Sequence, residues 1–190
     1  MIRHGFRFSV SAIVLTAATV AALLFAPGFV GAGPERPSDA LTIIDLDGSK
    51  ITISYDEISK MPQVTELQCI CVGQHAGYIG IFDYSGVRLA NILEKATAAM
   101  NASGYRKENM YAVFRGTDGY QVIASWTELT LAETGRRALV ALHADAKALP
   151  NTEGRFRIVF PADKYVGRNV KCLEQIEIRC AEGCVDFESH

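Results

Sequence analysis

Residues 67–96, LQCICVGQHAGYIGIFDYSGVRLANILEKA, carry the strongest fold signal in the chain. The run Thr65–Val72 is mostly apolar and is typical of a strand, and Cys69 lies near its end. Glycines at positions 73, 77 and 80 then interrupt the apolar pattern, which predicts a glycine-rich loop. From Leu89 onward apolar residues recur at helical spacing, so Leu89–Met100 is predicted to be an amphipathic helix. A strand that ends in a cysteine therefore leads through a glycine-rich loop into a helix.

The rest of the chain consists of short strand-like runs and turns. Two hairpins are predicted, one from Thr42–Leu46 and Lys50–Ile53 and the other from Met110–Arg115 and Tyr120–Ser125. Further strands are predicted at Arg137–His143, Phe156–Phe160 and Val170–Arg179, and short helices at Tyr55–Lys60 (capped by Ser54) and Trp126–Leu131. The predicted fold class is α+β, with a mixed, mainly antiparallel sheet and a few helices.

The composition excludes several classes of protein. The chain has 190 residues, is 49% hydrophobic and carries 19 basic and 21 acidic side chains, for a formal net charge of −2. This is rich enough in apolar residues for a packed core and argues against a disordered chain. The absence of a positive excess argues against a general nucleic-acid binder. No phosphate loop, dinucleotide fingerprint or G-x-S-x-G motif is present.

The first 32 residues have the pattern of a secretory signal peptide. Arg3 and Arg7 precede an uncharged run over residues 8–25, and Val30-Gly31-Ala32 predicts cleavage after Ala32. The alternative is an uncleaved membrane anchor, since a run of roughly 18 apolar residues is just long enough to span. Either way we expect the remainder to be exported, to a periplasmic or other extracytoplasmic location. The predicted domain organisation is then a linker at 33–40, one domain at 41–180 and a C-terminal tail at 181–190.

The chain has five cysteines, at positions 69, 71, 172, 180 and 184, which can form disulfides or bind a metal. In an oxidising compartment four of them can form disulfides, with Cys69 or Cys71 bridged to Cys172 or to the tail pair. Alternatively, Cys69, Cys71 and His75 can bind a soft metal such as copper, although this spacing alone is a weak signal.

The order of elements resembles a known family. The strand-end cysteine, the glycine-rich loop, the run Tyr84–Leu89 and the helix after it are similar to the oxidoreductase molybdopterin-binding domain. That fold is shared by sulfite oxidases and the catalytic subunit of periplasmic methionine-sulfoxide reductases. A second stretch, RFRIVFPADKYVGRNVKCLEQIEI at residues 155–178, is similar to the family's Arg-hydrophobic-Val-hydrophobic-Pro strand and the lysine-containing turn after it. The resemblance covers roughly residues 40–180 and implies a sulfite-oxidase-type fold.

The resemblance also implies a cofactor and the residues that bind it. The cofactor is molybdenum-molybdopterin, and a strand-end cysteine supplies a thiolate to the metal. The spacing to Tyr84-Ser85-Gly86 assigns this role to Cys69, with Cys71 as the rival because Cys71-Val72 also matches the family's Cys-Val dipeptide. Four residues are expected to face the cofactor's phosphate through cationic, amide or backbone donors: Arg157, Asn169, Val170 and Lys171.

Two functions follow from this reasoning. The first is an exported molybdopterin-dependent oxidoreductase that transfers an oxygen atom or two electrons on a small oxo substrate, such as a sulfoxide or sulfite. This enzyme would use a membrane or periplasmic electron-transfer partner and no nucleic acid. The alternative is a binding or accessory module that keeps the fold, lacks the cofactor and has its cysteines in disulfides. Metal analysis of the purified protein separates these functions.

Overall fold

The structure is a computed structural model in which residues 38–96 and 106–182 are described. Residues 1–37, 97–105 and 183–190 lie outside the described part. The predicted signal peptide, most of the linker and most of the tail fall there, so these remain predictions. Among the described residues, no helix is long and apolar enough to cross a membrane.

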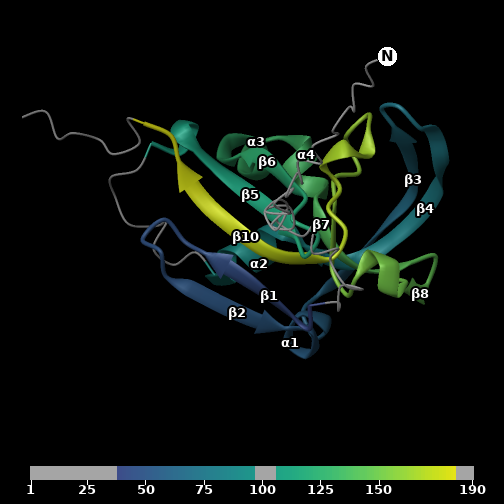
Figure 1. The fold of residues 1–190 in the computed structure, drawn as a ribbon, viewed down its shortest axis with the longest axis horizontal. Coiled ribbons are helices and arrows are strands. Elements are labelled where there is room, and N and C mark those ends of the chain that lie inside the picture. The colour runs from purple at the N-terminus through teal and green to yellow at the C-terminus, as the bar shows by residue number, and fades with distance from the viewer. Residues whose placement is uncertain (1–37, 97–105, 183–190) are drawn as a thin grey trace, which may run out of the picture. The chain divides into compact units, whose positions relative to one another are not determined.

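The described residues form two five-stranded sheets (Figure 1). The first contains, in spatial order, β2 (Lys50–Ser54), β1 (Ala40–Ile44), β10 (Leu173–Cys180), β5 (Met110–Gly116) and β6 (Gln121–Ser125). The second contains β3 (Gln63–Gly73), β4 (Gly77–Arg88), β7 (Leu139–Ala144) and β8 (Lys147–Ala148), with β9 (Arg157–Val159) paired to β7. Strands β1 and β10 are parallel and the other described pairs are antiparallel, so the predicted mixed, mainly antiparallel arrangement is confirmed.

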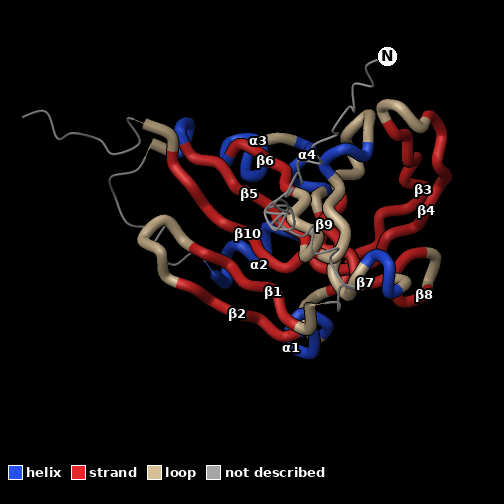
Figure 2. Tube along the Cα trace, viewed as in Figure 1, coloured by secondary structure: helices blue, strands red, loops and turns tan. Residues whose placement is uncertain are grey.

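Short helices connect the strands (Figure 2). They are α1 (Tyr55–Ser59), α2 (Leu89–Ala96), α3 (Trp126–Leu131) and α4 (Glu133–Arg137), with 3-10 turns η2 (Lys107–Asn109), η3 (Asn151–Glu153) and η4 (Val166–Arg168). Helix α1 begins where the sequence predicts. The Ser54 hydroxyl accepts a bond from the Glu57 amide, and the Glu57 carboxylate accepts one from the Ser54 amide, which makes a capping box.

The segment with Gly73, Gly77 and Gly80, predicted to be a glycine-rich loop, is instead the end of β3, a short turn at residues 74–76 and the start of the long strand β4, so that prediction is largely wrong. Two glycines of β4, Gly80 and Gly86, lie where a side chain has no room. A Cβ added at Gly86 would lie 2.0 Å from the Val140 carbonyl oxygen of β7, and one at Gly80 would lie 2.8 Å from the Phe82 ring. Gly86 therefore lets β4 approach β7 closely, which is a common reason for glycine inside a strand, and Gly80 leaves room for the Phe82 ring of the same strand.

The last strand also begins later than predicted, at Leu173 rather than Val170. Cys172 has a φ of +48°, which is outside the extended region and interrupts the strand before Leu173. Helix α4 was not predicted as a separate element.

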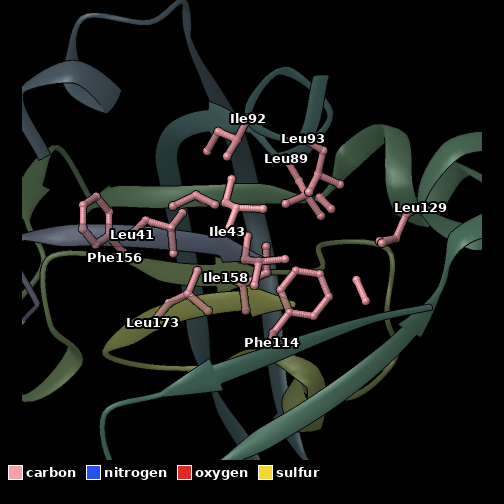
Figure 3. Close-up of a cluster of buried hydrophobic side chains, with 14 of the residues drawn as sticks. Leu41, Ile43, Leu89, Ile92, Leu93, Phe114, Leu129, Phe156, Ile158 and Leu173 are labelled. Carbon is pink, nitrogen blue, oxygen red and sulfur yellow. The ribbon is translucent and has the colours of Figure 1, made fainter. Parts of the chain in front are cut away.

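The two sheets share one hydrophobic core (Figure 3). It takes Leu41 and Ile43 from β1, Phe114 from β5, Ile158 from β9 and Leu173 from β10. A second, smaller cluster lies on the second sheet and comprises Cys69, Cys71, Tyr84, Leu139, Ala141 and Val159. Both candidate metal-ligating cysteines therefore lie in this smaller cluster, away from the main core.

Candidate functional site

A β-bulge on β3 orients the cysteines. The pairing of β3 with β4 shifts by one residue between Glu66 and Cys69, and Gln68 within this bulge has a φ of +52°. The Gln68 amide donates to Asp83 Oδ1 at 2.7 Å, which holds the bulge against β4. As a result Glu66 and Cys69 are both buried. Because side chains alternate along a strand, Cys71 lies on the same face as Cys69.

A pocket of about 280 Å³ lies against the hairpin β3–β4 and is closed by the segments that follow β7 and β9. Its polar and charged lining comprises Cys71, Tyr84, Asp145, Glu153, Arg157, Asn169 and Lys171. The structure thus brings together four of the predicted site residues, namely Cys71, Arg157, Asn169 and Lys171. Cys69 and Val170 are not among the residues that line this pocket.

A thiol, a phenol and a guanidinium meet at the floor of the pocket. The sulfur of Cys71 lies 3.9 Å from the Tyr84 hydroxyl oxygen, and both residues are almost fully buried. The guanidinium carbon of Arg157 lies 5.2 Å from the centroid of the Tyr84 ring, within the range of a cation–π contact. Burial is the chief reason that the pKa of Tyr84 is raised, so the phenol keeps its proton at neutral pH.

A single carboxylate, that of Glu153, joins the two cations of the pocket. Its Oε2 accepts a bond from Arg157 Nη1 at 2.5 Å, and its Oε1 lies 3.1 Å from Lys171 Nζ. Burial alone would raise the pKa of Glu153, but the charges and hydrogen bonds of Arg157 and Lys171 outweigh it and hold the pKa below its usual value. The carboxylate is therefore charged at neutral pH.

Backbone contacts fix where Glu153 sits. The amide of Cys172 donates to the Glu153 carbonyl at 2.7 Å. Gly154, next in the chain, has a φ of +78°, and a Cβ there would lie 2.6 Å from the Cys172 Cα. Because Lys171 precedes Cys172 directly, this contact brings the lysine within reach of the glutamate.

Asn169 and Val170 shape the wall next to Lys171. Asn169 lines the pocket, and its Oδ1 accepts a bond from the Phe160 amide at 2.9 Å, which ties the loop to the end of β9. The side chain of Val170 is fully buried in the main core, and its carbonyl accepts a bond from the Ile158 amide at 3.0 Å. Val170 therefore supports the wall from behind.

Cys69 belongs to a different environment. Its sulfur donates to the Glu66 carbonyl at 3.5 Å, and the Glu66 carboxylate pairs with Arg88 at 2.6 Å and Arg137 at 2.7 Å. Burial is the main reason, and the Glu66 charge a second, that the pKa of the Cys69 thiol is raised. Cys69 thus lies beside an ion-pair network, whereas Cys71 faces the pocket.

Comparison with known proteins adds the family. A sequence model described as "Oxidoreductase molybdopterin binding domain" matches residues 34–184. The chain belongs to this family. Among solved structures, this molybdopterin-binding domain is similar to the sulfane dehydrogenase SoxCD from Paracoccus pantotrophus, with a TM-score of 0.58 and 18% sequence identity. The match covers 76% of this chain and 39% of that one, so the chain spans well under half of that protein's length. None of the curated proteins matches the chain. The predicted sulfite-oxidase-type fold is confirmed.

The polar lining of this molybdopterin-binding domain fits the chemistry of the family's cofactor in most respects. The cofactor that the resemblance implies needs a thiolate at its metal and cationic or amide donors at its phosphate. Cys71 can supply the first, and Arg157, Lys171 and Asn169 the second. Within the described part of the chain, the buried Nε of Arg157 has no hydrogen-bond partner, which leaves a donor available to a ligand. Glu153 does not fit this pattern, because its carboxylate already pairs with the two cations, Arg157 and Lys171.

Two other predictions for the cysteines were a disulfide to Cys172 and a soft-metal site with His75. Cys69, Cys71 and Cys172 each keep a thiol, so the expected bridge from Cys69 or Cys71 to Cys172 is absent. Cys184 lies outside the described residues. Over the described ranges no group of three His, Cys, Asp or Glu side chains is placed to hold a metal ion. His75 is exposed at the turn of the β3–β4 hairpin, so the soft-metal prediction is wrong.

Sequence reasoning missed Glu153 altogether and gave Tyr84 no role in the pocket. Tyr84 already stood in the quoted motif, and its alternation with Phe82 and Gly86 along one strand was the usable signal. Glu153 is four residues before Arg157, a spacing that indicates an ion pair on a helix and carries no such meaning in a loop before a strand. Only the tertiary contact with Cys172 reveals it.

Proposed function

We propose that this domain holds a molybdenum-molybdopterin cofactor in the pocket between Cys71 and Lys171 and acts as an oxidoreductase on a small oxo substrate, such as a sulfoxide or sulfite. The observation that carries this proposal is the convergence, in one pocket, of a buried thiol and two cationic side chains from three separate segments. When bound, the cofactor supplies the oxygen-atom or two-electron transfer, and the protein supplies binding, orientation and access.

The proposal takes Cys71, the rival in the sequence argument, as the thiolate ligand. Motif spacing favours Cys69, but Cys71 lines the pocket with Arg157 and Lys171 and Cys69 does not. A cysteine can bind a metal in the pocket only if its sulfur faces the pocket. Cys71 is therefore the better candidate on geometry.

The other residues have binding and positioning roles in this proposal. Arg157 and Lys171 would hold the phosphate, as charge-assisted donors do. Asn169 keeps the loop against β9 through its bond to Phe160, and Tyr84 packs under the Arg157 guanidinium. Together they would fix one end of the cofactor while Cys71 binds the other.

Export and a redox partner are part of the same proposal. The basic start, the apolar run 8–25 and the small residues before Gly33 support export to a periplasmic or similar compartment. A centre that exchanges two electrons with its substrate must be returned to its starting state. We therefore include a membrane or periplasmic electron-transfer partner, with no specific surface assigned to it.

A second candidate function, a cofactor-less accessory module, is favoured by one observation. Glu153 already neutralises Arg157 and Lys171, which a phosphate would otherwise pair with. In this case the fold would form the pocket, but the pocket would hold no cofactor.

Molybdenum and pterin content separate the two functions. The full chain is produced in a host that makes molybdopterin, and both contents are measured per mole of folded protein. The proposed function predicts close to one of each per chain and turnover of a sulfoxide or sulfite. Folded protein with neither molybdenum nor pterin would refute it and support the accessory module.

A further inference from the structure

We propose that Glu153 is a built-in competitor for the anion site, so that its carboxylate occupies the donors of Arg157 and Lys171 that a phosphate group would use. This inference rests on the proposed function to the extent that it takes the pocket as a phosphate site. It adds a residue that sets how tightly the site binds an anion.

The geometry is that of a carboxylate standing where an anion would stand. Each Glu153 oxygen is engaged by a different cation, Oε2 by Arg157 at 2.5 Å and Oε1 by Lys171 at 3.1 Å. The side chain of Arg157 is 9% exposed and that of Glu153 17% exposed, so water competes weakly for this pairing. An incoming phosphate must displace the carboxylate from at least one cation.

The formal charge of the pocket also supports Glu153 as a competitor for an anion. Its lining holds two cations, Arg157 and Lys171, and two carboxylates, Glu153 and Asp145, so these formal charges balance. A phosphate dianion that enters a pocket with no net formal charge is attracted only weakly, and it must also lose its bound water. Removing one carboxylate charge leaves the pocket with a positive excess that favours an anion.

The contacts also indicate which part can move. The backbone of Glu153 is held by Cys172, and Gly154 packs against Cys172, so the loop itself stays in place. The side chain of Lys171 is 52% exposed and can follow a ligand, and Arg157 has a spare Nε donor. Release of the site therefore needs only a rotation of the Glu153 side chain, with the loop unchanged.

The test measures binding of inorganic phosphate by isothermal titration calorimetry at low ionic strength. The full chain is produced in a host that makes no molybdopterin, as wild type, Glu153→Gln and Glu128→Gln. Glu128 is a matched control because its carboxylate also accepts two bonds from an arginine, Arg168, outside this pocket. We expect Glu153→Gln to bind phosphate about tenfold more tightly than wild type or more, and Glu128→Gln to match wild type.

Two further variants keep the test decisive. In Glu153→Gln/Lys171→Gln the gain should disappear, because the anion loses one of its two cations. If Glu153→Gln does not fold, Glu153→Asp serves in its place, since the shorter side chain cannot span both cations and should give a smaller gain. Equal phosphate affinity in wild type and the folded Glu153 variant, or a gain that survives loss of Lys171, would overturn the inference.

Failure of this inference is distinguishable from failure of the proposed function. If wild type retains molybdenum and Glu153→Gln gains no phosphate affinity, the function stands and the role of Glu153 is refuted. If no molybdenum is retained but Glu153→Gln gains phosphate affinity, the pocket is an anion site with an internal competitor and the cofactor proposal is refuted.

Discussion

Glu66 shows how one residue can hold several elements together. It is 8% exposed, lies at the bulge of β3 and pairs with Arg88 at the end of β4 and Arg137 at the end of α4. Arg88 Nη1 also donates to the Arg137 carbonyl at 2.7 Å, so the three residues form one network. A carboxylate buried this deeply stabilises the fold only while its cations stay bound.

Replacing Glu66 should therefore cost stability in a pH-dependent way. Burial would raise the pKa of Glu66, but bonds from Arg137 and Arg88 outweigh it and keep the pKa below the ordinary value. The unfolded carboxyl, with a pKa of roughly 4.3, takes up protons at a higher pH than the folded one. The stabilisation is thus complete above that pH and is lost as pH falls through the folded pKa.

We expect Glu66→Gln to lower the free energy of unfolding at pH 7 by about 1–3 kcal/mol. Urea denaturation from pH 7 down to pH 3 should show the gap between wild type and Glu66→Gln shrinking as pH falls. A gap that stays constant over this range would contradict the role assigned to the charge.

At the scale of elements, the hairpins β1–β2 and β5–β6 were predictable and β4 was not. Both hairpins can be predicted from their turn residues, which are Asp47-Gly48 in one and Gly116–Gly119 in the other. Gly77 and Gly80 interrupt the apolar pattern at the start of β4, and the reason for Gly86 lies in β7, over fifty residues further along the chain. A requirement imposed by a distant strand leaves no local pattern.

The strand explanation of Gly86 predicts a large effect of one methyl group. Gly86→Ala should lower the free energy of unfolding by about 3 kcal/mol or more, because the added Cβ would clash with the β7 backbone. Gly167→Ala is the control, since nothing lies within 4 Å of a Cβ added there, and should change it by less than about 0.5 kcal/mol. Similar small effects at both positions in urea unfolding would refute the packing argument.

The same contrast of local and distant signals applies to the site. Arg157, Asn169 and Lys171 were predictable because the stretch 155–178 resembles the family's, and all three line the pocket. Which of Cys69 and Cys71 lines the pocket was not predictable, because both lie on the same face of β3 and only the surrounding segments give them different environments. Glu153 could not be predicted, because the contacts that place it, with the Cys172 amide and the Lys171 side chain, come from a segment about twenty residues further along the chain.

At the scale of the whole molecule, the family match begins at residue 34, just after the predicted cleavage position. If the first 32 residues direct export and are removed, the N-terminal residue of protein recovered from the extracytoplasmic fraction is Gly33. N-terminal sequencing or intact mass measurement checks this. Recovery of the chain starting at Met1 from a membrane fraction would favour the uncleaved anchor instead.

In the proposed function, the sulfur of Cys71, which faces the pocket, holds the metal. The most direct measurement is molybdenum per folded chain in wild type, Cys71→Ser and Cys69→Ser, all purified from a host that makes molybdopterin. We predict near one molybdenum per chain in wild type and in Cys69→Ser, and loss of most of it in Cys71→Ser. Retention of stoichiometric molybdenum by Cys71→Ser would refute Cys71 as the ligand, and its absence from wild type would refute the proposed cofactor.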